Sequence, residues 1–109
     1  MRDCIMVVGS GMMGSGIGAM SALAGNRTIL VDVDESHVRS GMEKAMACID
    51  LRVGNGLNTA EEAEEAKKRM ETSIDMLKAA ASARMVIEAV VEQLEVKQAL
   101  FAKLDEEIG

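Results

Sequence analysis

Proline, tryptophan and tyrosine are absent from the 109-residue sequence, and phenylalanine and histidine each occur once. A core without these rings must be built from aliphatic residues, alanine and the ten methionines, whose flexible side chains fill irregular spaces. The single histidine, His37, is the only imidazole available for proton transfer near neutral pH. We expect His37 to be a partly exposed helix residue, and we assign no catalytic residue.

Cysteine is also scarce. Cys4 and Cys48 lie in apolar segments, without CxxC spacing and without a second cluster of Cys and His. This pattern argues against a metal site and favours free, buried thiols in a cytoplasmic protein. No segment approaches the roughly twenty apolar residues of a membrane span. Asp3 and the interrupting glycines distinguish the apolar N-terminal stretch from a signal peptide.

A basic surface is not expected either, because 18 acidic residues outnumber 12 basic ones and give a formal net charge of -6. Nucleic acids and anionic membranes attract clustered Lys and Arg, so neither is predicted as a partner. The length allows one domain, residues 1–109. It leaves no room for a separate substrate domain.

Short apolar runs alternate with helical spacing in the first half of the chain. The runs at 4–8 and 28–31 predict buried strands, the first ending in Gly9 and the second in Asp32. Between them, a four-residue spacing predicts the apolar face of a helix: Met13, Ile17, Met20 and Ala24. A strand, a helix and a strand in about thirty residues form a βαβ unit.

The following segment predicts a long helix with Asp34 or Ser36 as its N-cap. Its predicted apolar face comprises Val38, Met42, Ala45, Met46, Ile49 and Val53. A second helix is predicted by a capping box of Thr59 and Glu62. Its exposed face carries two i,i+4 pairs, Glu64 with Lys68 and Glu65 with Arg69.

The last third of the chain is less regular. The spacing at 71–74 and 76–81 gives weak support for a short strand and a helical turn. A third clear apolar run predicts a strand over 85–91, and four-residue steps predict an amphipathic helix over 96–108. As the end of the sheet, strand 85–91 would expose an apolar edge, and we expect a homo-oligomer through it.

The turn between the first strand and the first helix has the glycine spacing G-x-G-x-x-G. Its six residues are Gly9, Ser10, Gly11, Met12, Met13 and Gly14. A strand before the glycines and a helix after them indicate a dinucleotide site. The first glycine permits the tight turn, the second lets the pyrophosphate approach, and the third lets helix pack on strand. The alternative is that the glycines serve helix packing alone.

Asp32 lies 18 residues after Gly14, close to the roughly twenty at which such folds place an acidic residue on the adenosine ribose. Its carboxylate can accept hydrogen bonds from both ribose hydroxyls and would repel a 2'-phosphate. Since no Arg directly follows Asp32, NAD is favoured over NADP. The alternative role is to cap the next helix, for which Asp34 is the better candidate.

Beyond this motif, three blocks resemble the N-terminal domain of 3-hydroxyacyl-CoA dehydrogenases. They are residues 7–17, residues 29–32, and residues 86–92 with the Val-Lys and Leu-Phe pairs at 96–97 and 100–101. The resemblance implies NAD-dependent oxidation of 3-hydroxyacyl-CoA to 3-ketoacyl-CoA, in fatty-acid or butyrate metabolism. It also implies that Val90, Val91, Glu92 and Lys97 line the cofactor, with Lys97 facing the acyl-CoA as well. The alternative for Lys97 is a surface helix lysine.

We therefore predict an α/β Rossmann fold, mostly parallel, with strand order 3-2-1-4 and without the family's last strands. By the resemblance, the family's catalytic Ser, His, Glu and Asn and its helical second domain would follow Gly109. We expect this chain to bind NAD without turnover, and to contact acyl-CoA only together with that missing domain. The alternatives are a stand-alone NAD-binding or NAD-sensing module and another β-hydroxyacid dehydrogenase.

Overall fold

Four parallel strands form one sheet in the order β3-β2-β1-β4. The computed structural model describes residues 3–89. In chain order its elements are β1 (Cys4–Val8), α1 (Met12–Leu23), β2 (Arg27–Val31), α2 (Glu35–Gly54), α3 (Ala60–Lys68), β3 (Met70–Ser73), α4 (Met76–Ser82) and β4 (Met85–Glu88). The predicted strand order is confirmed. The strand predicted over 85–91 ends at Glu88, before Ala89. Residues 90–91 of that prediction and the helix predicted over 96–108 lie outside the described residues.

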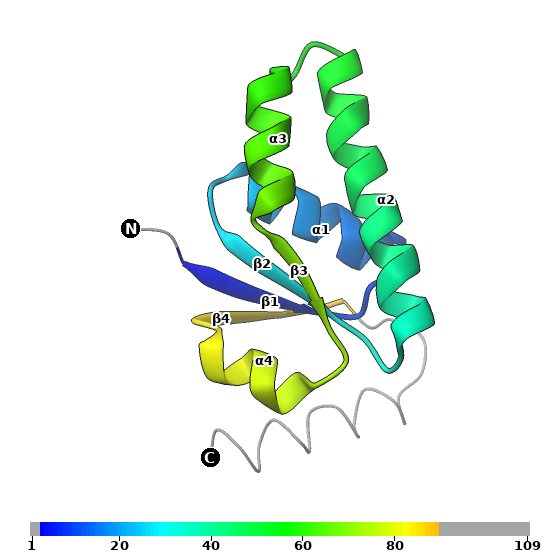
Figure 1. Cartoon of the computed structure of the whole chain (residues 1–109), viewed down its shortest axis with the longest axis vertical. Helices are drawn as coiled ribbons and strands as arrows, with labels where there is room; N and C mark the ends of the chain where they lie inside the picture. Colours follow the sequence, from blue (N-terminus) through cyan, green and yellow to red (C-terminus); the bar gives the residue numbers. More distant parts are fainter. Residues whose placement is uncertain (1–2, 90–109) are drawn as a thin grey trace.

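Helices cover both faces of this sheet, with α1, α2 and α3 on one face and α4 on the other (Figure 1). Strand side chains alternate between the faces, so Ile5 and Val7 pack toward α1, whereas Met6 and Val8 pack toward α4. Met6, Val7 and Val8 are at most 1% exposed. Because β1 is buried on both faces, its sequence is continuously apolar rather than alternating.

The helix α1 is present as predicted, but the face it buries is not the predicted one. Met13 and Met20 are 57% and 46% exposed. The buried residues of α1 are instead small ones: Gly14, Ser15, Gly18, Ala19 and Ala22. A helix lying close against a strand has no room for long side chains, so the larger methionines point outward.

Close packing is tightest at Gly14. A Cβ added there would lie 1.7 Å from the carbonyl oxygen of Gly9, and one at Gly18 would lie 2.8 Å from Cδ2 of Leu30. Leu30 can move its side-chain end, whereas the Gly9 carbonyl belongs to the backbone. By contrast, a Cβ at Gly16 would meet no atom within 4 Å.

The helices α2 and α3 form an antiparallel pair between β2 and β3. The predicted caps are confirmed, since Asp34 accepts from the backbone of His37 and Thr59 and Glu62 form a capping box. The predicted apolar face of α2 is also confirmed, with Val38, Ala45 and Ile49 buried. Met42, Met46 and Val53 are half-buried against the same core.

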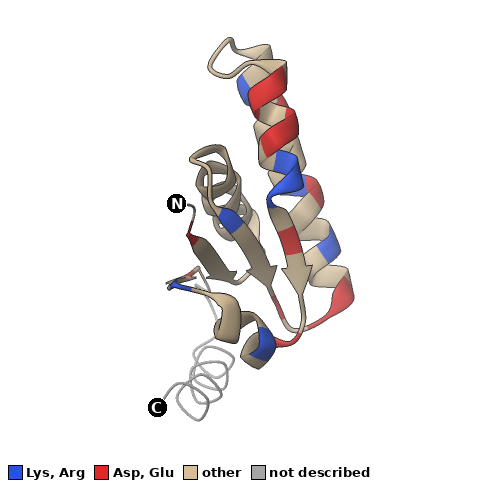
Figure 2. Cartoon of the chain, turned by 60° about the vertical axis from the view of Figure 1, so that its left-hand side comes forward, with Lys and Arg blue, Asp and Glu red and all other residues tan. Residues whose placement is uncertain are grey.

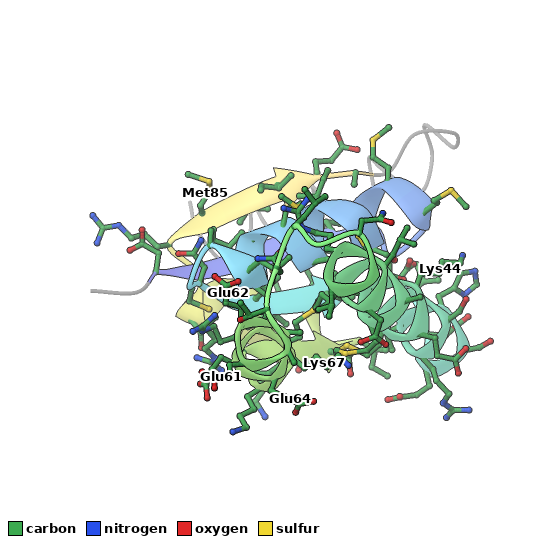
Figure 3. The ribbon with its side chains drawn as sticks, turned by 90° about the horizontal axis from the view of Figure 1, so that it is seen from above. Lys44, Glu61, Glu62, Glu64, Lys67 and Met85 are labelled. Carbon is green, nitrogen blue, oxygen red and sulfur yellow. The ribbon has the colours of Figure 1, made fainter. Side chains whose placement is uncertain are left out.

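Charged residues gather on the outer sides of α2 and α3, while the strands carry few (Figure 2). Figure 3 shows Lys67 on the side of α3 that faces α2, where its Nζ lies 2.7 Å from Oδ1 of Asp50. The predicted pairings at i,i+4 differ from those observed: Lys68 pairs with Glu65 at 3.7 Å, and Arg69 donates to the carbonyl of Ala22. Arg69 bonds the end of α1 instead of its own helix.

The two cysteines are free, as predicted, but they are half-buried rather than buried. Cys48 packs against the core on the α1 face and Cys4 against the core on the α4 face. The sheet therefore separates the two thiols. No helix among residues 3–89 has the length and apolar character needed to cross a membrane.

At the start of α2, the imidazole of His37 bonds the helix cap. Its Nδ1 lies 2.8 Å from Oδ1 of Asp34, and the ring is exposed as predicted. This hydrogen bond, with the charges of Asp34 and then Asp32, raises the pKa of His37, while the bonds from His37 lower the pKa of Asp34. A raised folded-state pKa favours folding at low pH, and this contribution is lost as pH rises through that pKa.

The packing of α1 predicts opposite effects for two glycines of one helix. We expect Gly14→Ala to destabilise the fold by about 1–3 kcal/mol, because its methyl group meets backbone that cannot move aside. Gly16→Ala should stabilise it by about 0.5–1 kcal/mol through helix propensity. Urea unfolding of both variants measures these changes in the free energy of unfolding. Equal changes in the two variants would contradict the close packing at Gly14 and the free space at Gly16.

The hydrogen bond between His37 and Asp34 at the start of α2 predicts that the pKa of His37 depends on the charge of Asp34. As the only histidine, His37 gives one imidazole signal in NMR, and its pKa should lie above the ordinary value. Asp34→Asn should lower that pKa because the paired charge is lost, while Asn still caps the helix. Asp50→Asn changes net charge equally, far along α2, and should leave the pKa of His37 in place. Equal shifts in both variants would refute the specific pairing.

Candidate functional site

The turn after β1 begins with a glycine in a conformation that other residues avoid. Gly9 has φ of 97°, and its N–H donates to the carbonyl of Val31 at 2.8 Å. This bond joins the ends of β1 and β2. The turn therefore starts at the carboxyl edge of the sheet, where open α/β sheets bind their ligands.

The first turn of α1 faces outward from this edge and has no side-chain cap among the described residues. Gly11 occupies the N-cap position without a capping hydrogen bond, whereas the other three helices within residues 3–89 are capped by Asp34, Thr59 and Asp75. The first N–H groups of a helix lack partners inside it and lie at the positive end of its dipole. An anion such as a phosphate can satisfy them.

Space is also available at this position. A Cβ on Gly11 would meet no atom within 4 Å, and Met12 is 81% exposed. Gly14, by contrast, lies against the Gly9 carbonyl as described above. The glycines of the motif thus have three different surroundings: a positive φ at Gly9, free space at Gly11 and close packing at Gly14.

The side chain of Ser10 is buried beneath the glycine turn. The residue is 2% exposed, and its backbone N–H donates to Oδ2 of Asp32 at 2.9 Å. Its Oγ lies 2.8 Å from the same Oδ2 and 2.8 Å from the carbonyl oxygen of His37. Its own carbonyl accepts from Oγ of Ser15 at 2.9 Å. Ser10 therefore links β2, α2 and α1.

The carboxylate of Asp32 lies at the end of β2, beside the glycine turn. Its Oδ2 accepts both hydrogen bonds of Ser10, and its Oδ1 accepts from the N–H of Val33 at 2.7 Å. A carboxylate has about four acceptor positions, so one position remains, on Oδ1. The sequence suggested that Asp32 can accept from both ribose hydroxyls; this stays a prediction, and Oδ1 is the oxygen with the free position.

Helix α2 presses directly on this arrangement through Gly41. A Cβ on Gly41 would lie 2.5 Å from both Cβ and the carbonyl oxygen of Ser10. Gly41 was not among the predicted site residues. A glycine on the buried face of a long helix was the one signal for Gly41 in the sequence.

The structure brings seven of the predicted site residues together at the carboxyl ends of β1 and β2. They are Gly9, Ser10, Gly11, Met12, Met13, Gly14 and Asp32. Val90, Val91, Glu92 and Lys97 lie outside the described residues. An uncapped helix start, free space at Gly11 and a carboxylate one strand away fit the phosphates and ribose of a dinucleotide.

Comparison with known proteins agrees with this geometry. Residues 4–108 match the family described as "3-hydroxyacyl-CoA dehydrogenase, NAD binding domain". The chain is 40% identical over 102 residues to 3-hydroxyadipyl-CoA dehydrogenase of Escherichia coli, covering 94% of this chain and 21% of that protein. It is 35% identical to 3-hydroxybutyryl-CoA dehydrogenase of Mycobacterium tuberculosis, covering 96% and 37%.

Solved structures share the fold as well. The crystal structure of 3-hydroxybutyryl-CoA dehydrogenase from E. coli superposes with a TM-score of 0.84 at 39% identity, covering 97% of this chain and 22% of that one. The chain thus spans between about a fifth and two fifths of the length of these relatives. The resemblance noted in the sequence is confirmed. The chain belongs to the family of NAD-binding domains of 3-hydroxyacyl-CoA dehydrogenases.

Proposed function

We propose that this chain holds NAD for a 3-hydroxyacyl-CoA dehydrogenase, with the pyrophosphate at the start of α1 and the adenosine ribose at Asp32. The observation that carries the proposal is the uncapped N-terminus of α1 beside free space at Gly11, in a chain whose other described helices are capped. Backbone N–H groups of the first turn would bind the phosphate oxygens. When bound, NAD supplies the hydride acceptor for oxidising a 3-hydroxyl group.

Asp32 supports NAD over NADP. The remaining acceptor position on Oδ1 suits one ribose hydroxyl, whereas a 2'-phosphate would meet the negative carboxylate. Asp34 follows two residues later and adds charge of the same sign. This end of β2 therefore disfavours the extra phosphate.

The acyl-CoA substrate would be bound mainly by residues outside 3–89. The only histidine of the chain bonds Asp34 and lies next to the proposed ribose position, not at the far end of a dinucleotide. His37 is thus poorly placed to accept the substrate's hydroxyl proton. This placement supports a cofactor-holding role, with Val90, Val91, Glu92 and Lys97 as proposed cofactor contacts.

Two further parts of the proposal concern binding partners and cellular location. Outer strand β4 pairs with β1, and Met85 on it is 56% exposed and points away from the sheet (Figure 3). We infer that this edge joins another chain or segment. The acidic net charge argues against nucleic acid, and two free thiols suit the cytoplasm.

Calorimetric titration with NAD and NADP tests the cofactor assignment. We expect the chain to bind NAD more tightly than NADP. Asp32→Asn should weaken NAD binding about tenfold, because a hydrogen bond to a charged group is lost. Asp32→Asn should also reduce the difference in affinity between NAD and NADP.

Asp75→Asn provides the matched control. It removes one negative charge from another helix cap, at α4 on the opposite face of the sheet. Its nucleotide affinities should equal those of the unchanged chain. Failure of the unchanged chain to bind either nucleotide would overturn the proposed function, and equal effects of both variants would overturn the role of Asp32.

We also expect the 109-residue chain to bind NAD without turning over substrate, because its one histidine lies on the adenosine side. Incubation with NAD and 3-hydroxybutyryl-CoA should yield no NADH above a reaction with the substrate omitted. Sustained NADH formation that depends on the chain would contradict this expectation.

A further inference from the structure

Ser10 occupies a cofactor motif, yet its polar groups all point into the protein. Its N–H, hydroxyl and carbonyl contact Asp32, His37 and Ser15, and the residue is 2% exposed. A residue this buried cannot serve as a direct ligand of the phosphates without a rearrangement of the turn. Its contribution must pass through a neighbour.

The neighbour with the strongest link is Asp32. Two donors of Ser10 converge on one oxygen, Oδ2, at 2.9 and 2.8 Å. Together with the N–H of Val33 on Oδ1 they leave the carboxylate a single acceptor position. The orientation of that last position is fixed by the bonds that fill the other three.

The hydroxyl of Ser10 also has more acceptors than protons. One hydroxyl carries one proton, while its Oγ lies 2.8 Å from both Oδ2 of Asp32 and the carbonyl of His37. Because a hydrogen bond to an ionised acceptor is the stronger one, the proton favours Oδ2 of Asp32. Gly41 of α2 lies close to Ser10, since an added Cβ there would lie 2.5 Å from Cβ of Ser10.

We propose that Ser10 is a positioning residue that sets cofactor specificity, by holding Asp32 so that one acceptor position faces the adenosine ribose and its charge faces any 2'-phosphate. This inference rests on the proposed function. The hydroxyl acts by preorganising the carboxylate before the nucleotide arrives. Without it, Oδ2 keeps only the backbone bond, and the carboxylate can rotate away from the ribose or from a 2'-phosphate.

Ser10→Ala tests this inference, with Ser15→Ala as the matched control. Both remove one buried hydroxyl from the same turn, but Ser15 bonds the carbonyl of Ser10 and does not bond Asp32. Dissociation constants for NAD and NADP are measured on both variants, and thermal unfolding reports their stability. The ratio of the two dissociation constants is the readout, because a purely structural loss weakens the binding of both nucleotides alike.

We expect Ser10→Ala to weaken NAD binding about threefold to tenfold and to lower the NADP-to-NAD ratio of dissociation constants by about threefold or more. Ser15→Ala should leave that ratio unchanged, whatever its effect on stability. In an Asp32→Asn background, Ser10→Ala should change the ratio no further, because the carboxylate through which it acts is gone. Ser10→Gly, which also lacks the hydroxyl and is smaller, replaces Ser10→Ala if the latter does not fold.

The other outcomes distinguish a failure of this inference from a failure of the proposed function. NAD binding by the unchanged chain, with the same ratio in Ser10→Ala, overturns the inference and leaves the proposed function standing. Equal ratio changes in Ser10→Ala and Ser15→Ala show a general loosening of the turn and also overturn it. No binding of NAD by the unchanged chain overturns the proposed function and this inference together.

Discussion

The approach of the Gly9 carbonyl oxygen to Gly14 is the contact on which the rest of the site depends. Only a residue without a side chain allows it, since an added Cβ would lie 1.7 Å from that oxygen. The contact places the first turn of α1 directly above the end of β1. It therefore fixes where the unpaired N–H groups of α1 are located relative to Asp32 on the neighbouring strand.

The same constraint explains the unusual composition of α1. Because α1 begins so close to β1, it continues close to the sheet, and its inner face consists of Gly, Ser and Ala. The methionines of the helix lie outside, where periodicity alone did not expect them. Amphipathic spacing identifies a helix reliably, but its usual interpretation assumes that large apolar side chains are the buried ones. At short helix-to-strand distance the small residues are buried instead.

Strands β1 and β2 and the caps of α2 and α3 could be predicted from local patterns, because each depends on neighbouring residues. Strand β3 was weakly indicated, since Glu71 and Thr72 are exposed on an outer strand and give no apolar run. The pairing of Arg69 with the Ala22 carbonyl spans 47 residues, and that of Ser10 with Asp32 spans 22. Such contacts arise only when the chain is folded, so spacing in the sequence could suggest Asp32 but not its partner.

The helices within residues 3–89 differ in how the N–H groups at their starts are capped. Side chains cap the starts of α2, α3 and α4, whereas no side chain among residues 3–89 caps the start of α1. Asp32 likewise keeps one acceptor position beyond its three internal bonds. Donors at the helix start and an acceptor at the strand end form a complementary pair of contacts for a molecule with phosphates and sugar hydroxyls. In the proposed binding mode the dinucleotide would supply the hydrogen bonds that these groups lack, and because a ligand that binds only the folded chain stabilises it, binding would favour the folded state.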